Sequence, residues 1–203
     1  MSFKSKWVLF NTLAMLTSYL FYTPIAHGVT GAHEHEMTAE QIVAHCIAHA
    51  FVALVLFLSQ RYVLKEYIYI SWYRIVLSIF AFLGLFYVGY YQEIIPGGLD
   101  TDILFGYLVL GSGLWIGTVP FKGNEIASVI AILSFPLASF IGELILFLIV
   151  TNFNIEFDVQ SSALNHSIFW VTVGVTTGLL GGWIGGQALS GILITQKADL
   201  KKQ

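Results

Sequence analysis

Long runs of apolar residues with almost no charge limit this chain to very few folds. The run Trp7–Ile25 is interrupted only by uncharged polar residues, and similar runs follow along the chain. About 20 such residues are enough to cross the hydrocarbon core of a bilayer. Charged residues make up only 10% of the chain, whereas soluble domains carry about 25%. The sequence therefore predicts an all-α polytopic membrane helix bundle inserted in a lipid bilayer.

Start and stop signals divide this single transmembrane domain, residues 1–203, into about six helices. Thr38 and Gln41 have the spacing of a capping box, which predicts that a helix starts at Ala39. The preceding residues, 27–38, are expected to form an exposed loop rich in His and Glu. The transmembrane helices are expected at about 7–26, 39–64, 70–92, 101–119, 124–152 and 162–195.

The first apolar stretch has a second interpretation. A basic start, an apolar middle and Pro24 followed by small residues are also typical of a secretory signal peptide. Cleavage would then follow Ala26, Gly28 or Ala32, and the last of these would leave His33 at the N-terminus, where its amine and imidazole together can bind copper. We expect instead that the stretch is kept as the first membrane helix.

The basic residues predict the orientation. With six spans, all nine Lys and Arg residues fall on one face of the membrane and most of the twelve acidic residues fall on the other. Loops rich in Lys and Arg stay on the cytoplasmic side. We therefore expect both termini to be cytoplasmic, in the cytoplasmic membrane of a bacterium or archaeon. The basic residues are Lys4, Lys6, Arg61, Lys65, Arg74, Lys122, Lys197, Lys201 and Lys202.

Histidines gather on the opposite, outer side, and one acid lies deep in a span. An ionisable group inside a membrane is expensive, so Glu143 marks a functional site by default. At about 1.5 Å of rise per residue, Glu143 and His49 lie roughly 14 and 16 Å below the outer ends of their helices. His45 lies one turn above His49 on the same helix face. His166 lies near the start of the last helix.

These residue types are suited to a divalent metal ion. Imidazole and carboxylate groups bind zinc, copper, iron and nickel. The sequence predicts a site in the outer leaflet made by His45, His49, His166 and Glu143, with loop residues that collect or deliver the ion. The protein would then be a metal-binding or transport-type membrane subunit. The candidate loop ligands are His33, Glu34, His35 and Glu36.

Three other interpretations of the same residues stay open. A b-type haem can be held by one histidine from each of two helices, such as His45 or His49 with His166. His49 and Glu143 can instead form a hydrogen bond with a purely structural role. They can also relay protons, because histidine titrates near neutral pH.

A stripe of small residues with a spacing of four runs along the last helix. Such stripes allow another helix backbone to come close in a membrane. One interpretation is packing inside the bundle, and the other is contact with a second subunit, a second copy or a flat ligand. The second makes the chain a non-catalytic accessory subunit of a larger membrane complex. The stripe consists of Gly174, Gly178, Gly182, Gly186 and Ser190.

Several classes of function are not indicated. The net charge of −3 and the lack of a basic cluster give no sign of nucleic acid as a partner. The single cysteine, Cys46, rules out an internal disulfide. The Gly-rich segment 181–186 lies inside an apolar helix and not after a strand, so it does not predict a dinucleotide site. No catalytic residue is identified.

Overall fold

The computed structural model describes residues 1–27, 39–92, 125–152 and 163–200, and all regular secondary structure in these ranges is helical. The all-α prediction is therefore confirmed for this part of the chain. The expected helix 101–119 lies outside it, as does nearly all of the loop 27–38. In chain order the elements are α1 (Phe3–His27), α2 (Ala39–Leu64), α3 (Trp72–Gln92), α5 (Glu125–Asn152), α6 (Ala163–Thr176), the π-helical turn η1 (Thr177–Gly181) and α7 (Gly182–Leu200).

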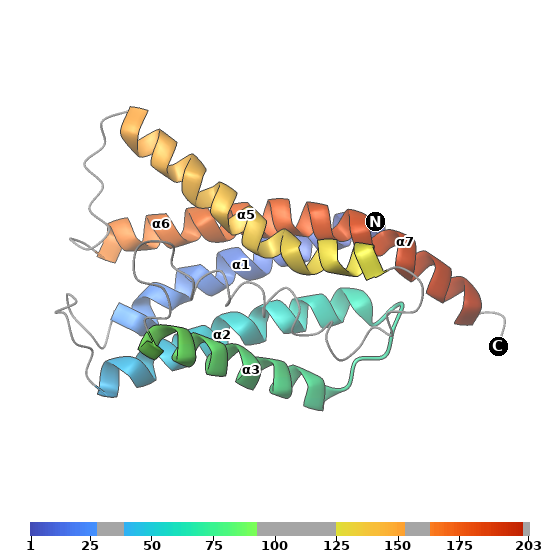
Figure 1. Cartoon of the computed structure of the whole chain (residues 1–203), viewed down its shortest axis with the longest axis horizontal. Coiled ribbons are helices and arrows are strands. Elements are labelled where there is room, and N and C mark those ends of the chain that lie inside the picture. Colours follow the sequence, from blue (N-terminus) through green and yellow to red (C-terminus); the bar gives the residue numbers. More distant parts are fainter. Residues whose placement is uncertain (28–38, 93–124, 153–162, 201–203) are drawn as a thin grey trace.

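The helix ends follow local chemistry. Helix α1 starts before Trp7, because the Lys6 N–H donates to the Ser2 carbonyl over 3.0 Å. The first turns of the helix therefore include the basic residues Lys4 and Lys6. Pro136 lies inside α5, where a proline removes one backbone hydrogen bond and favours a kink. Figure 1 shows α5 bending about midway along its length. The last helix is continuous through η1 and ends at Leu200, beyond the expected 195.

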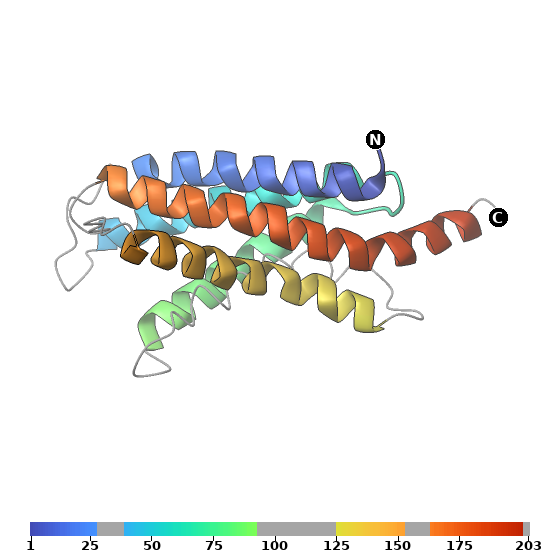
Figure 2. The same ribbon diagram turned by 90° about the horizontal axis from the view of Figure 1, so that it is seen from above.

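Among the described helices, α1 is the central one. It packs on α2 on one side and on α6, η1 and α7 on the other. Helix α3 packs on α2, and α5 packs on α6, η1 and α7. In Figure 1, α2 lies beside α1 and α5 crosses the orange-to-red helix made of α6, η1 and α7, while in Figure 2 α5 runs alongside that helix. Helix α1 therefore joins two groups of helices.

The start of α1 and the end of α7 lie toward the same end of the molecule in both views, together with the α2–α3 turn (Figures 1 and 2). Two contacts tie this end together. Lys4 donates to the side chain of Gln187, and Lys6 forms an ion pair with Glu66, with Nζ and Oε1 2.5 Å apart. The hydrogen bond to Glu66 raises the pKa of Lys6, which lies outside the expected membrane spans. We call this the basic end.

Apolar side chains cover the outer faces of the described helices, while several polar ones are buried. Exposed residues of α5 include Leu133, Leu137, Phe140 and Leu144. Helix α3 exposes Val76, Leu77 and Phe80 in the same way. The core is apolar as well, but the outer faces of a soluble bundle carry charged and polar residues instead. The buried polar side chains include Asn11, Ser18, Gln60, Ser78, Ser128, Ser134, Ser139 and Thr177.

Two of the described helices contain segments that are long and apolar enough to cross a membrane. These segments are Cys46–Leu64 in α2 and Ile126–Asn152 in α5. The segment Trp72–Gly84 in α3 is apolar but shorter. Length and composition thus support a membrane location for two helices, and the total of six spans stays a prediction.

Candidate functional site

His49 lies on α2 at the junction of three helices. Its side chain is half-buried. The imidazole centroid is 5.0 Å from that of the Tyr22 ring on α1, nearly perpendicular to it, and 6.0 Å from that of Phe82 on α3. The pair with Tyr22 has the favourable edge-to-face geometry, and the pair with Phe82 is tilted at 38°. These contacts hold the imidazole between α1 and α3, in the half of α2 that is farther from the basic end.

Two of the other predicted ligands are placed by their helices. Because α2 is continuous from Ala39 to Leu64, His45 and His49 occupy positions i and i+4 of one regular helix face. His166 lies in the first turn of α6. The side chains of His45 and His166 lie outside the described residues, and so do the loop ligands His33, Glu34, His35 and Glu36.

Glu143 lies on α5 and is half-buried. It accepts a hydrogen bond from the hydroxyl of Ser139, one turn earlier, over 3.4 Å. The adjacent Gly142 packs on Thr176 of α6, and a Cβ built at Gly142 would lie 3.1 Å from the Thr176 Cβ. A hydroxyl donor lowers the cost of burying a carboxylate, so part of the environment of Glu143 is polar and comes from its own helix.

The expected pairing of His49 with Glu143 stays a prediction. Among the described helices, the backbone of α2 packs closely on α1 and α3, and that of α5 on α6, η1 and α7. Depth in the bilayer places two residues at one level but does not by itself place them side by side. No three His, Cys, Asp or Glu side chains in the described ranges are close enough to hold one ion. The side chains of His45 and His166 are not among those described. The four-ligand site stays a prediction.

The small-residue stripe is used inside the chain. Gly174, Gly178, Gly182 and Gly186 are all buried against α1. A Cβ built at Gly178 would lie 2.6 Å from the Thr12 Cα, so only glycine lets the two backbones come this close. The structure thus agrees with the first interpretation of the stripe, in which its small residues pack against another helix of the same chain. Self-association through these four glycines stays a prediction, and it would require α1 to move away.

A buried pair of amides is the feature that the sequence analysis missed. Asn11 on α1 donates to the Trp7 carbonyl over 2.7 Å. Gln60 on α2 donates from Nε2 to the Asn11 Oδ1 over 3.1 Å. Both side chains are fully buried, and the Oε1 of Gln60 has no hydrogen-bond partner among the described residues. The sequence signal that could have predicted this pair is that Asn11 and Gln60 are each a single amide within an apolar run.

The arrangement therefore offers a histidine pair on α2, an acid on α5 and an amide pair between α1 and α2. Imidazoles at i and i+4 can bind one metal ion from one helix face, and the carboxylate can add a charged ligand or hold a proton. No family model matches the chain, and no curated protein or solved structure does.

Proposed function

We propose that this chain is a six-span protein of the cytoplasmic membrane of a bacterium or archaeon, with both termini cytoplasmic, that binds a divalent metal ion in its outer half. It acts as a metal-binding or transport-type membrane subunit. The observation that carries the proposal is the His45–His49 pair on α2, a turn apart on a regular helix, with His49 half-buried between aromatic rings.

The membrane orientation is supported by where charge and apolar surface lie. Lysines from α1 and the turn after α2 lie at one end of the molecule, and the histidine pair lies toward the other end of α2. Exposed apolar side chains cover the faces between the two ends. This arrangement fits a bilayer, in which the apolar faces contact lipid and the basic end lies on the cytoplasmic side, where Lys and Arg remain.

Membrane topology can be tested with introduced cysteines. Because Cys46 is the only cysteine, a Cys46→Ser chain provides a background for single cysteines at Ser2 or Ser161. We expect a membrane-impermeant maleimide applied to intact cells to label Ser161→Cys and to spare Ser2→Cys, which reacts only after the membrane is permeabilised. Labelling of Ser2→Cys in intact cells, or recovery of the protein in the soluble fraction, would overturn the topology.

Metal binding can be tested on the full chain purified in detergent. We expect about one zinc, copper, iron or nickel ion per chain by elemental analysis. His45→Ala and His49→Ala should each weaken binding at least tenfold, since removal of even an outer-shell partner of a ligand costs about 10- to 100-fold. Cys46→Ser is the matched control, because Cys46 is rotated by about 100° from His45 on the same helix and should leave affinity unchanged.

The remaining predicted ligands are tested with the same assay. A loss of affinity in Glu143→Gln or His166→Ala would extend the site to α5 or α6. Unchanged affinity would restrict it to α2 and residues 33–36. A wild-type chain that binds no metal, or His45→Ala and His49→Ala variants that bind it as well as wild type, would refute the metal-binding function. A visible haem absorption band in the purified chain would replace it with the haem alternative.

A second candidate function is that of a non-catalytic accessory subunit. It is favoured by the way the rows of glycine on α6–η1–α7 hold α1 and α5 in one tight group, which suits a structural part of a larger membrane complex. Partner subunits that co-purify in fixed ratio, from a preparation without metal, would support this function over the first.

A further inference from the structure

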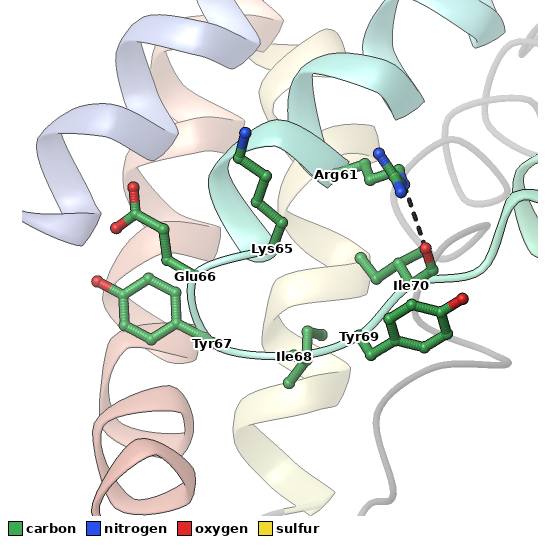
Figure 3. A pocket seen from close by; sticks show the side chains of 7 residues that line it. All are labelled: Arg61, Lys65, Glu66, Tyr67, Ile68, Tyr69 and Ile70. Atoms are coloured by element: carbon green, nitrogen blue, oxygen red, sulfur yellow. Dashed lines mark hydrogen bonds between the residues drawn. The ribbon is translucent and has the colours of Figure 1, made fainter. Parts of the chain in front are cut away.

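The turn between α2 and α3 forms a pocket of about 330 Å³. It is lined by Arg61 and by residues 65–70, which close a loop at the basic end of the molecule (Figure 3). Ile68 and Ile70 contribute apolar side chains, and Arg61 and Lys65 contribute charge. The pocket thus combines two cations with an apolar surface.

Both cations are held in place by neutral groups. The Arg61 Nε donates to the Ile70 carbonyl over 3.1 Å, and its guanidinium lies 4.3 Å from the centre of the Trp72 ring. The Lys65 Nζ lies 4.4 Å from the centre of the Tyr62 ring. Cation–π contacts fix a cation without neutralising it. Among the described residues neither cation forms an ion pair.

The nearby acid is already compensated. Glu66 lines the same pocket, but its carboxylate is paired with Lys6 of α1, at 2.5 Å. Lys6 and Glu66 cancel, which leaves the positive charges of Arg61 and Lys65. The pocket therefore attracts an anion, and the N–H groups of a guanidinium suit the oxygens of a phosphate.

The surroundings of the pocket favour an anion that is part of a lipid. Tyr69, Trp72 and Tyr73 are large, exposed aromatic residues next to it, and Trp and Tyr gather at the level of lipid headgroups. Basic pockets between membrane helices on the cytoplasmic side bind anionic headgroups. We propose that Arg61 and Lys65 bind the phosphate of an anionic phospholipid in the cytoplasmic leaflet. This inference rests on the membrane orientation proposed above.

The test uses the full chain in bilayer discs of phosphatidylcholine that contain a small fraction of phosphatidylglycerol. Native mass spectrometry after detergent release counts the phosphatidylglycerol retained per chain. We expect wild type to retain it selectively, and the double variant Arg61→Gln/Lys65→Gln to retain about 25-fold less, the product of about fivefold for each basic residue.

The control removes two charges at the same end but outside the pocket. Lys4 contacts Gln187, and Arg74 lies over its neighbour Tyr73, 5.7 Å from the ring centre. We expect Lys4→Gln/Arg74→Gln to retain phosphatidylglycerol nearly as well as wild type. Equal losses in the two double variants would show attraction by surface charge alone and would overturn the specific site.

Two further outcomes separate the possible causes of failure. Displacement of phosphatidylglycerol by millimolar inorganic phosphate would show a site for a free anion and would overturn the lipid assignment. Each variant must keep the wild-type far-ultraviolet circular dichroism, so that a loss of lipid is not a loss of fold. If the maleimide labelling confirms the orientation and wild type shows no selectivity, the lipid inference fails and the proposed membrane function stands.

Discussion

Gly178→Ala is expected to destabilise the bundle by about 1–3 kcal/mol, the usual cost of forcing an extra carbon into a packed site. The new Cβ would lie 2.6 Å from the Thr12 Cα and 3.0 Å from the Asn11 carbonyl oxygen. Both atoms belong to the backbone of α1, which cannot move away as the end of a side chain can. Helix α1 must therefore shift as a whole. The measurement is unfolding in mixed detergent micelles, followed by circular dichroism.

The matched control is Gly191→Ala on the same continuous helix. A Cβ at Gly191 meets nothing within 4 Å, and alanine is favoured over glycine in a helix interior by about 1 kcal/mol. This variant should be as stable as wild type or more so. If Gly178→Ala unfolds at the same point as Gly191→Ala, then α1 does not pack on η1 as the structure describes.

Asn11→Leu is expected to destabilise the chain by about 1–2 kcal/mol. The change leaves the Nε2 of Gln60 without its acceptor in a fully buried position, and an orphaned buried polar group costs about 1–3 kcal/mol. Polar pairs inside membrane proteins average only about 0.6 kcal/mol. We expect the larger of these two costs because Gln60 is completely buried, so its amide cannot reach water. The same micelle unfolding assay measures it.

A double-mutant cycle separates this interaction from packing effects. Asn11→Leu/Gln60→Leu removes both amides, so its destabilisation should be smaller than the sum of the two single changes. The single change Gln60→Leu also removes the Oε1 that has no hydrogen-bond partner among the described residues, so it should cost less than Asn11→Leu. Strictly additive effects would mean that the 3.1 Å hydrogen bond does not contribute to stability.

The positions of the helices were predictable from the sequence because their ends carry local signals. The capping box at Thr38 and Gln41 predicted the start of α2 at Ala39, where the structure has it. The polar residues after Asn152 limited α5 in the same way. Such signals depend on the first and last turns of a helix and need no knowledge of its neighbours.

The neighbours of each helix were not predictable, and this limited what the sequence could say of the candidate site. Helices that are apolar on every side have no stripe that shows which face meets which partner. Depth alone matched His49 with Glu143, and depth does not say which helices pack together. Among the described helices, α1 contacts both α2, which carries His49, and the α6–η1–α7 helix on which α5 packs. The Asn11–Gln60 hydrogen bond was missed for the same reason. Glycine spacing predicted a close approach, but not that the approaching helix is α1.

The π-helical turn η1 explains why a repeat of four residues can follow a straight neighbour. In a regular α-helix, each step of four residues overshoots a full turn by about 40°, so the row Gly174, Gly178, Gly182 and Gly186 would wind around the helix. A π-helical turn takes in one more residue and sets the row back in phase. All four glycines thus keep facing α1, from Tyr19 down to Trp7. The bulge in the backbone tunes the helical pitch to the periodicity of the sequence.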